Sequence, residues 1–93
     1  MTAIKVLDDG RRLDISGDMT MAEVPALLNT IAAMNGVVHV DLSAVGRVDS
    51  SALTVLLACS RAAEGATVTV HHAPATLRAL NDLYGLQTLF WVV

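Results

Sequence analysis

The sequence lacks several features on which covalent or catalytic chemistry depends. It has one cysteine, Cys59, so it cannot form an intramolecular disulfide. Cys59 falls inside a predicted helix, and because reactive thiols need exposed, electropositive surroundings, we expect a buried structural thiol. There is no glycine-rich phosphate loop, no metal-ligand spacing and no histidine placed to activate a serine. We therefore expect no enzymatic activity, no cofactor and no bound metal.

Charge and long apolar runs are also scarce. Charged residues make up 16% of the chain and hydrophobic residues 54%, against a usual charged share of about 25%. The six Lys and Arg residues are scattered and the net charge is −3, which argues against nucleic-acid binding. No apolar run approaches the roughly 20 residues that span a bilayer, and no secretory signal pattern occurs. We expect a cytoplasmic protein with one domain, residues 1–93, and no direct membrane insertion.

What the sequence does contain is an alternation of strand and helix patterns. They predict an α/β fold in which a mixed β-sheet of four to five strands is faced by amphipathic helices. In the helix expected at 75–84, the apolar spacing predicts a buried stripe of Leu77, Leu80, Leu83 and Tyr84. Asn81 is expected on the outer face of that helix. The expected elements are strands at 3–7 and 11–16 joined by a hairpin turn at 8–10, a helix at 20–34, a strand at 37–42, a helix at 53–63, a strand at 67–72 and a helix at 75–84.

The chain is organised around the segment Gly46-Arg47-Val48-Asp49-Ser50-Ser51-Ala52-Leu53, where an apolar strand gives way to an apolar helix. Asp and Ser are favoured N-cap residues, so either Asp49 or Ser50 is expected to cap the helix. A helix N-terminus carries partial positive charge and unpaired N–H groups, which suit a phosphate. Ser50 and Ser51 are therefore candidates for modification.

Val48-Asp49-Ser50-Ser51-Ala52-Leu53 resembles the signature of STAS domains, the sulfate-transporter and anti-sigma-factor-antagonist domains, whose usual form is Asp-Ser-Ser-Gly or Asp-Thr-Gly-Gly before a Leu-rich helix. The resemblance extends over nearly the whole chain and predicts a STAS-like fold. It implies that Ser50 is the phosphorylatable residue and that the loop at Asp18 borders the same surface. The alternative for this loop is a turn in which Asp18 or Thr20 caps the next helix. Capping alone would also explain Ser50. Ala52 departs from the family pattern, since Gly usually stands there.

Arg47-Val48-Asp49-Ser50 and Leu83-Tyr84-Gly85-Leu86 together resemble the short, stand-alone STAS proteins of the MlaB subfamily. That resemblance implies a non-catalytic cytoplasmic subunit that binds the ATPase of an Mla-type ABC transporter and associates with the inner membrane through the ATPase and its permease. Such a transporter moves phospholipid between membranes to maintain outer-membrane lipid asymmetry. The alternative is an anti-sigma factor antagonist that an anti-sigma factor kinase phosphorylates at Ser50. The expected partner-binding residues are Asp18, Arg47, Asp49, Ser50, Ser51, Thr54, Val55 and Ala58.

Two further features stay open at this level. His39 lacks a second ligand at a useful spacing, and in a strand the adjacent His71 and His72 are expected to point to opposite faces. The apolar C-terminus, 86–93, is expected to complete the core, to dock on a partner or to contact a second copy in a homodimer.

Overall fold

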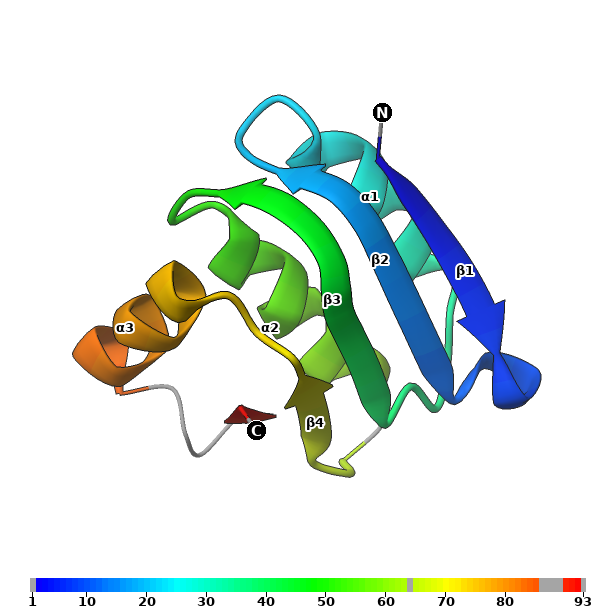
Figure 1. Ribbon diagram of the computed structural model, residues 1–93. Helices are drawn as coiled ribbons and strands as arrows, with labels where there is room; N and C mark the ends of the chain where they lie inside the picture. The colour runs from blue at the N-terminus through cyan, green and yellow to red at the C-terminus, as the bar shows by residue number, and fades with distance from the viewer. Residues whose placement is uncertain (1, 64, 86–89, 93) are drawn as a thin grey trace.

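The computed structural model describes residues 2–63, 65–85 and 90–92, and it confirms the mixed α/β fold. Five strands form one sheet in the order β1-β2-β3-β4-β5. β1 and β2 are antiparallel, whereas the other neighbours are parallel and are connected through helices (Figure 1). The elements are β1 (Ala3–Leu7), a 3-10 turn η1 (Asp8–Gly10), β2 (Arg12–Met19), α1 (Val24–Ala32), β3 (His39–Val48), α2 (Ala52–Ala62), β4 (Val68–His71), α3 (Ala75–Tyr84) and β5 (Phe90–Val92).

The predicted hairpin is confirmed, with Ile4 opposite Ile15 and Val6 opposite Leu13. The turn is longer than a two-residue Asp-Gly turn. Asp8 and Asp9 both take positive φ, and they form η1 with Gly10. Asp tolerates this left-handed region better than most residues.

α1 is shorter than the predicted helix at 20–34. It begins at Val24, because residues 20–23 form a separate turn in which the Glu23 carboxylate accepts a hydrogen bond of 3.2 Å from the Thr20 amide. Pro25 lies in its first turn, as expected of a residue that has no N–H to leave unpaired. α1 ends at Ala32 rather than at the predicted Met34. The Gly36 amide does not bond the end of α1 but donates a hydrogen bond of 2.6 Å to the Ala62 carbonyl at the end of α2.

β3 lies at the centre of the sheet, as its apolar sequence predicts, but it runs on to Val48. Its second half pairs with β2 through register shifts, with Ala44 opposite Ser16 and Val48 opposite Met19. This extension carries the chain directly to the start of α2.

The core lies between the sheet and the helices α1 and α2, which cover the same face (Figure 1). Cys59 is buried there, and burial raises the pKa of its thiol to about 12, in keeping with the expected structural role. The large side chains that are fully buried include Leu13, Ile15, Met19, Ile31, Val37, Val40, Leu42, Val55, Leu56, Val68 and Leu77.

α3 presents a different face from the one predicted. Asn81 is 2% exposed, whereas Leu83 and Tyr84 are 75% and 58% exposed. Leu77 and Asn81 lie four residues apart and so share the buried side of the helix. The prediction that Leu83 and Tyr84 are buried and Asn81 is exposed is therefore wrong. β5 forms a fifth strand beside β4. Residues 86–89 and 93 of the apolar C-terminus lie outside the described residues.

Candidate partner-binding site

Asp49 is the residue that organises the start of α2. One carboxylate oxygen accepts the Ser51 amide at 2.9 Å and also the Ser51 hydroxyl, and the other accepts the Met21 amide at 3.0 Å. The N-cap position of α2 is Ser51, whose side chain makes no capping bond, so neither predicted residue occupies that position. Of the two, Asp49 is the one whose side chain accepts an amide at the helix start, that of Ser51. Hydrogen bonds from the Ser51 side chain and the Met21 amide hold the pKa of Asp49 below its usual value.

Asp18 joins the same corner from the end of β2, as the resemblance implied. Its Oδ1 accepts the Arg47 amide at 2.9 Å. A Cβ at Gly46 would lie 2.8 Å from that oxygen, so a larger residue there would displace the Asp18 carboxylate. We call residues 18–23 and 46–51 the corner.

The turn at 20–23 completes the corner and was not predicted as part of the site. Glu23 accepts hydrogen bonds from the Thr20 amide and, at 2.5 Å, from its hydroxyl. This is half of a capping box, and the Thr-x-x-Glu spacing in the sequence was the signal that would have indicated it. The turn leaves the Met21 side chain 75% exposed beside Asp49.

The predicted contact residues divide into exposed and buried groups. Ser50, Arg47 and Thr54 are exposed, while Asp49, Ser51, Asp18 and Ala58 are half-buried. Val55 is fully buried, so its prediction as a contact residue is wrong. Ala52, Val55, Leu56 and Cys59 follow the i, i+3, i+4, i+7 spacing of the side of α2 that packs on the sheet.

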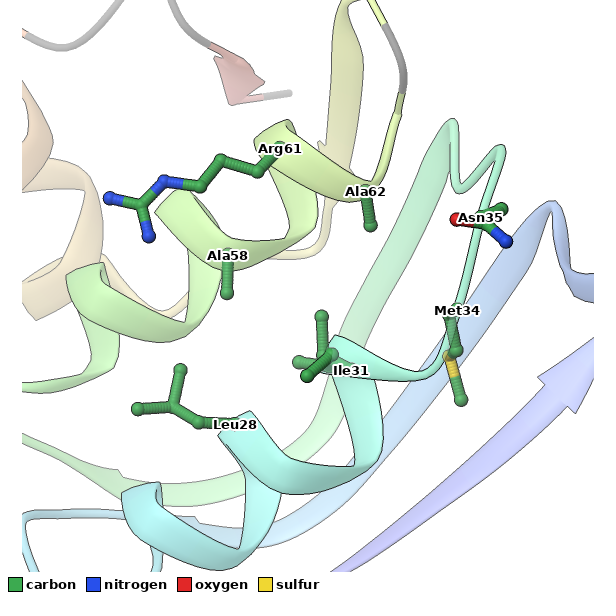
Figure 2. Close-up of a pocket in the computed structure, with 8 residues that line it drawn as sticks. Leu28, Ile31, Met34, Asn35, Ala58, Arg61 and Ala62 are labelled. Carbon is green, nitrogen blue, oxygen red and sulfur yellow. The ribbon is translucent and has the colours of Figure 1, made fainter.

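A groove of about 410 Å³ lies between α1 and α2 and extends the exposed side of α2 beyond Thr54. Leu28 and Ile31 project from α1 toward Ala58 of α2 (Figure 2). Ala58 is one turn beyond Thr54, so the corner and the groove adjoin along one helix. The lining residues are Leu28, Ile31, Ala32, Met34, Asn35, Ala58, Arg61 and Ala62.

The opposite, open face of the sheet carries a second polar cluster that the sequence did not predict. Arg12 bonds Asp14 and Asp41, each at 3.0 Å, and Asp41 is 3.3 Å from His72. His39 lies 3.0 Å from His71 across β3 and β4. His72 follows the strand with φ of 58°, which places its ring beside Asp41, so the expectation that His71 and His72 point to opposite faces is wrong. We call Arg12, Asp14, His39, Asp41, His71 and His72 the open-face cluster.

Asp41 is the buried centre of this cluster, with 8% exposure. Partial burial raises its pKa, but the hydrogen bonds from Ser43 and His72 outweigh that effect and leave the pKa below the usual value. Among the residues the structure describes, no three His, Cys, Asp or Glu side chains converge to hold a metal ion. Within the same residues, no helix is long and apolar enough to cross a bilayer.

The five-stranded mixed sheet, with a serine corner between β3 and α2, defines a STAS-type domain. The chain belongs to the MlaB-type STAS family, since the family model described as "Mlab, STAS domain" matches residues 3–92. No curated protein sequence matches the chain significantly.

Three solved structures with similar folds are described as anti-sigma factor antagonists, one of them as putative. The one from Mycobacterium paratuberculosis is 26% identical, with a TM-score of 0.73 and coverage of 99% of this chain and 83% of that one. A putative one from Thermotoga maritima is 13% identical, with a TM-score of 0.75 and coverage of 98% and 84%. SpoIIAA in its unphosphorylated form is 13% identical, with a TM-score of 0.68 and coverage of 100% and 87%. The chain therefore has an anti-sigma-factor-antagonist-like fold.

Proposed function

We propose that this chain is a non-catalytic subunit that binds and supports the ATPase of an Mla-type ABC transporter, which moves phospholipid between membranes and maintains outer-membrane lipid asymmetry. The observation that carries the proposal is the continuity of the exposed corner with the apolar groove. Ser50 and Thr54 are exposed at the start of α2, and Ala58, one turn beyond Thr54, lines the groove with Leu28 of α1. The membership of the MlaB-type family supports this choice of partner.

The corner suits binding because its backbone is held by carboxylates while its outward side chains stay available. Asp18 and Asp49 hold amides of two separate segments, so the surface is preorganised and little entropy is lost on docking. We place the chain in the cytoplasm, at the inner membrane only through the ATPase and its permease. Residues 1–93 form one STAS domain in this proposal.

The proposal is tested by measuring binding of the untagged chain to the purified Mla-type ATPase–permease complex of the same organism by biolayer interferometry. Thr54→Arg places a long cation on the exposed side of α2 and is expected to lower affinity at least about tenfold, the loss typical of a clash at a packed interface centre. Thr76→Arg is the matched control, because Thr76 is also an exposed threonine, on α3, and it should bind like wild type. Equal affinity for both variants would contradict the proposal.

A second reading is supported by the Ser50 side chain and by the similarity to anti-sigma factor antagonists. Ser50 is exposed just before the start of α2, so its hydroxyl is accessible to a kinase. In this alternative an anti-sigma factor kinase adds a phosphate of about −2 charge, which disrupts docking through repulsion and desolvation. Incubation with that kinase and ATP, followed by peptide mass spectrometry, would locate one phosphate on Ser50 and none in Ser50→Ala.

A further inference from the structure

The open face of the sheet brings two imidazoles from distant parts of the chain into contact. Val40 and Val70 point into the core, so their strand neighbours His39 and His71 point to the other side. α1 and α2 lie behind the sheet in Figure 1, and the near face of β1–β4 carries no described helix. The two rings are therefore reachable from solvent.

The two rings are positioned by strand register rather than by sequence proximity. His39 is opposite Thr69 and Asp41 is opposite His71, so the two histidines are diagonal neighbours. The ring centroids are 5.2 Å apart, with an angle of 40° between the planes. His39 Nδ1 and His71 Nε2 share a hydrogen bond of 3.0 Å, and a bound ion would take the place of its proton.

This separation fits chelation of a single ion. Imidazole nitrogens bind first-row divalent metals at about 2.0–2.1 Å. Two nitrogens 3.0 Å apart then subtend an angle of roughly 90–100° at the ion. Such an angle belongs to adjacent positions of a tetragonal or octahedral site, the geometry that Ni²⁺ and Cu²⁺ prefer with nitrogen ligands.

The charges around the two rings balance, and no neighbouring side chain among the described residues supplies a third ligand. Asp14 and Asp41 oppose the single charge of Arg12 within the cluster, while Lys5 is opposite Asp14 on the edge strand β1. Asp41 already forms an ion pair with Arg12 and accepts hydrogen bonds from the Ser43 amide, at 2.8 Å, and from His72. Water would therefore complete the coordination.

We propose that His39 and His71 form a two-imidazole site for one divalent transition-metal ion of the Ni²⁺ or Cu²⁺ type, with the remaining positions filled by water. The ion would tie β3 to β4 on the face opposite the corner. The site is separate from the partner-binding surface, so the metal-site proposal does not depend on the transporter proposal.

The test is titration of the untagged chain with Ni²⁺ by isothermal calorimetry. Wild type should bind one ion, and His39→Gln and His71→Gln should each weaken binding at least about tenfold, since even outer-sphere partners of metal ligands commonly matter that much. His72→Gln is the matched control, because it removes the third histidine of the cluster but neither proposed ligand, and it should retain wild-type affinity. Circular dichroism and melting temperature without metal show that each variant is folded.

Electron paramagnetic resonance with Cu²⁺ provides a second readout that does not depend on stability. Wild type should show nitrogen coupling from two imidazoles, and either single variant should show coupling from one at most. Equal Ni²⁺ affinity in wild type and His39→Gln, loss of binding in His72→Gln, or wild-type binding no tighter than that of free imidazole would each overturn the proposal.

Discussion

The corner and the open-face cluster are both polar, but they are held together in opposite ways. At the corner, Asp18 and Asp49 accept mainly backbone amides, together with the Ser51 hydroxyl at Asp49. On the open face, Asp41 holds the side chains of Arg12 and His72 as well as one amide. A region held through its backbone leaves its outward side chains free for a partner, whereas a region held by side chains depends on each of them. This difference predicts how each region responds to mutation.

The largest effect is expected at the centre of the open-face cluster. Asp41→Ala leaves the Ser43 amide without its acceptor and Arg12 with one carboxylate, and it should lower the free energy of unfolding by about 2–3 kcal/mol, as for other buried acceptors removed from paired donors. Urea denaturation measures the loss. Asp14→Ala is the control, because its ion pair is exposed and should contribute about 0–1 kcal/mol. Similar losses in both variants would show that burial at Asp41 does not matter.

At the corner, Asp49→Ala should have the next largest effect, because it removes the acceptor shared by the turn at 20–23 and the start of α2. Loss of a helix cap commonly lowers the melting temperature of a domain of this size by about 5 °C. Asp49→Asn keeps an amide oxygen as acceptor and should lose less. Differential scanning calorimetry compares the two, and equal melting temperatures for wild type and Asp49→Ala would exclude the capping role.

Lowering the pH should reduce the contribution of both regions to the free energy of unfolding. Asp49 and Asp41 have pKa values in the folded protein below those of an unfolded chain, so as pH falls the unfolded state takes up these protons first. Their contribution to stability is therefore complete above the unfolded carboxyl pKa of about 4 and is lost as the pH falls from there through the lower folded values. Asp49→Asn and Asp41→Asn should each lose less unfolding free energy than wild type between about pH 5 and pH 3. Parallel pH profiles for variants and wild type would count against this assignment.

The smallest effect is expected at Ser50. Because the Asp49 carboxylate accepts the amide at the helix start and Ser50 is exposed, Ser50→Ala should change the unfolding free energy by no more than about 0.5 kcal/mol, as for most surface substitutions. A helix cap at Ser50 would instead cost about 1 kcal/mol. Urea denaturation of Ser50→Ala beside Asp49→Ala separates the two assignments.

Much of the fold was predictable because it follows local spacing. The hairpin pairing, the central position of β3 and the bounds of α3 all agree with the predictions. Asn81 was misplaced because polarity was read as exposure, although it lies on the same side of α3 as Leu77. Val55 was misplaced because almost the whole circumference of α2 is apolar, so its pattern does not single out the buried side.

The sequence by itself determined the order of strands and helices and the place of the corner, since periodicity, caps and turns act over a few residues. It did not determine which residues of separate strands meet. His39 and His71 are 32 positions apart, and they become neighbours because packing of Val40 beside Val70 in the core fixes the register of β3 against β4. The convergence of Asp18, Met21 and Asp49 at one corner was decided in the same way, by strand pairing that brings the ends of β2 and β3 together.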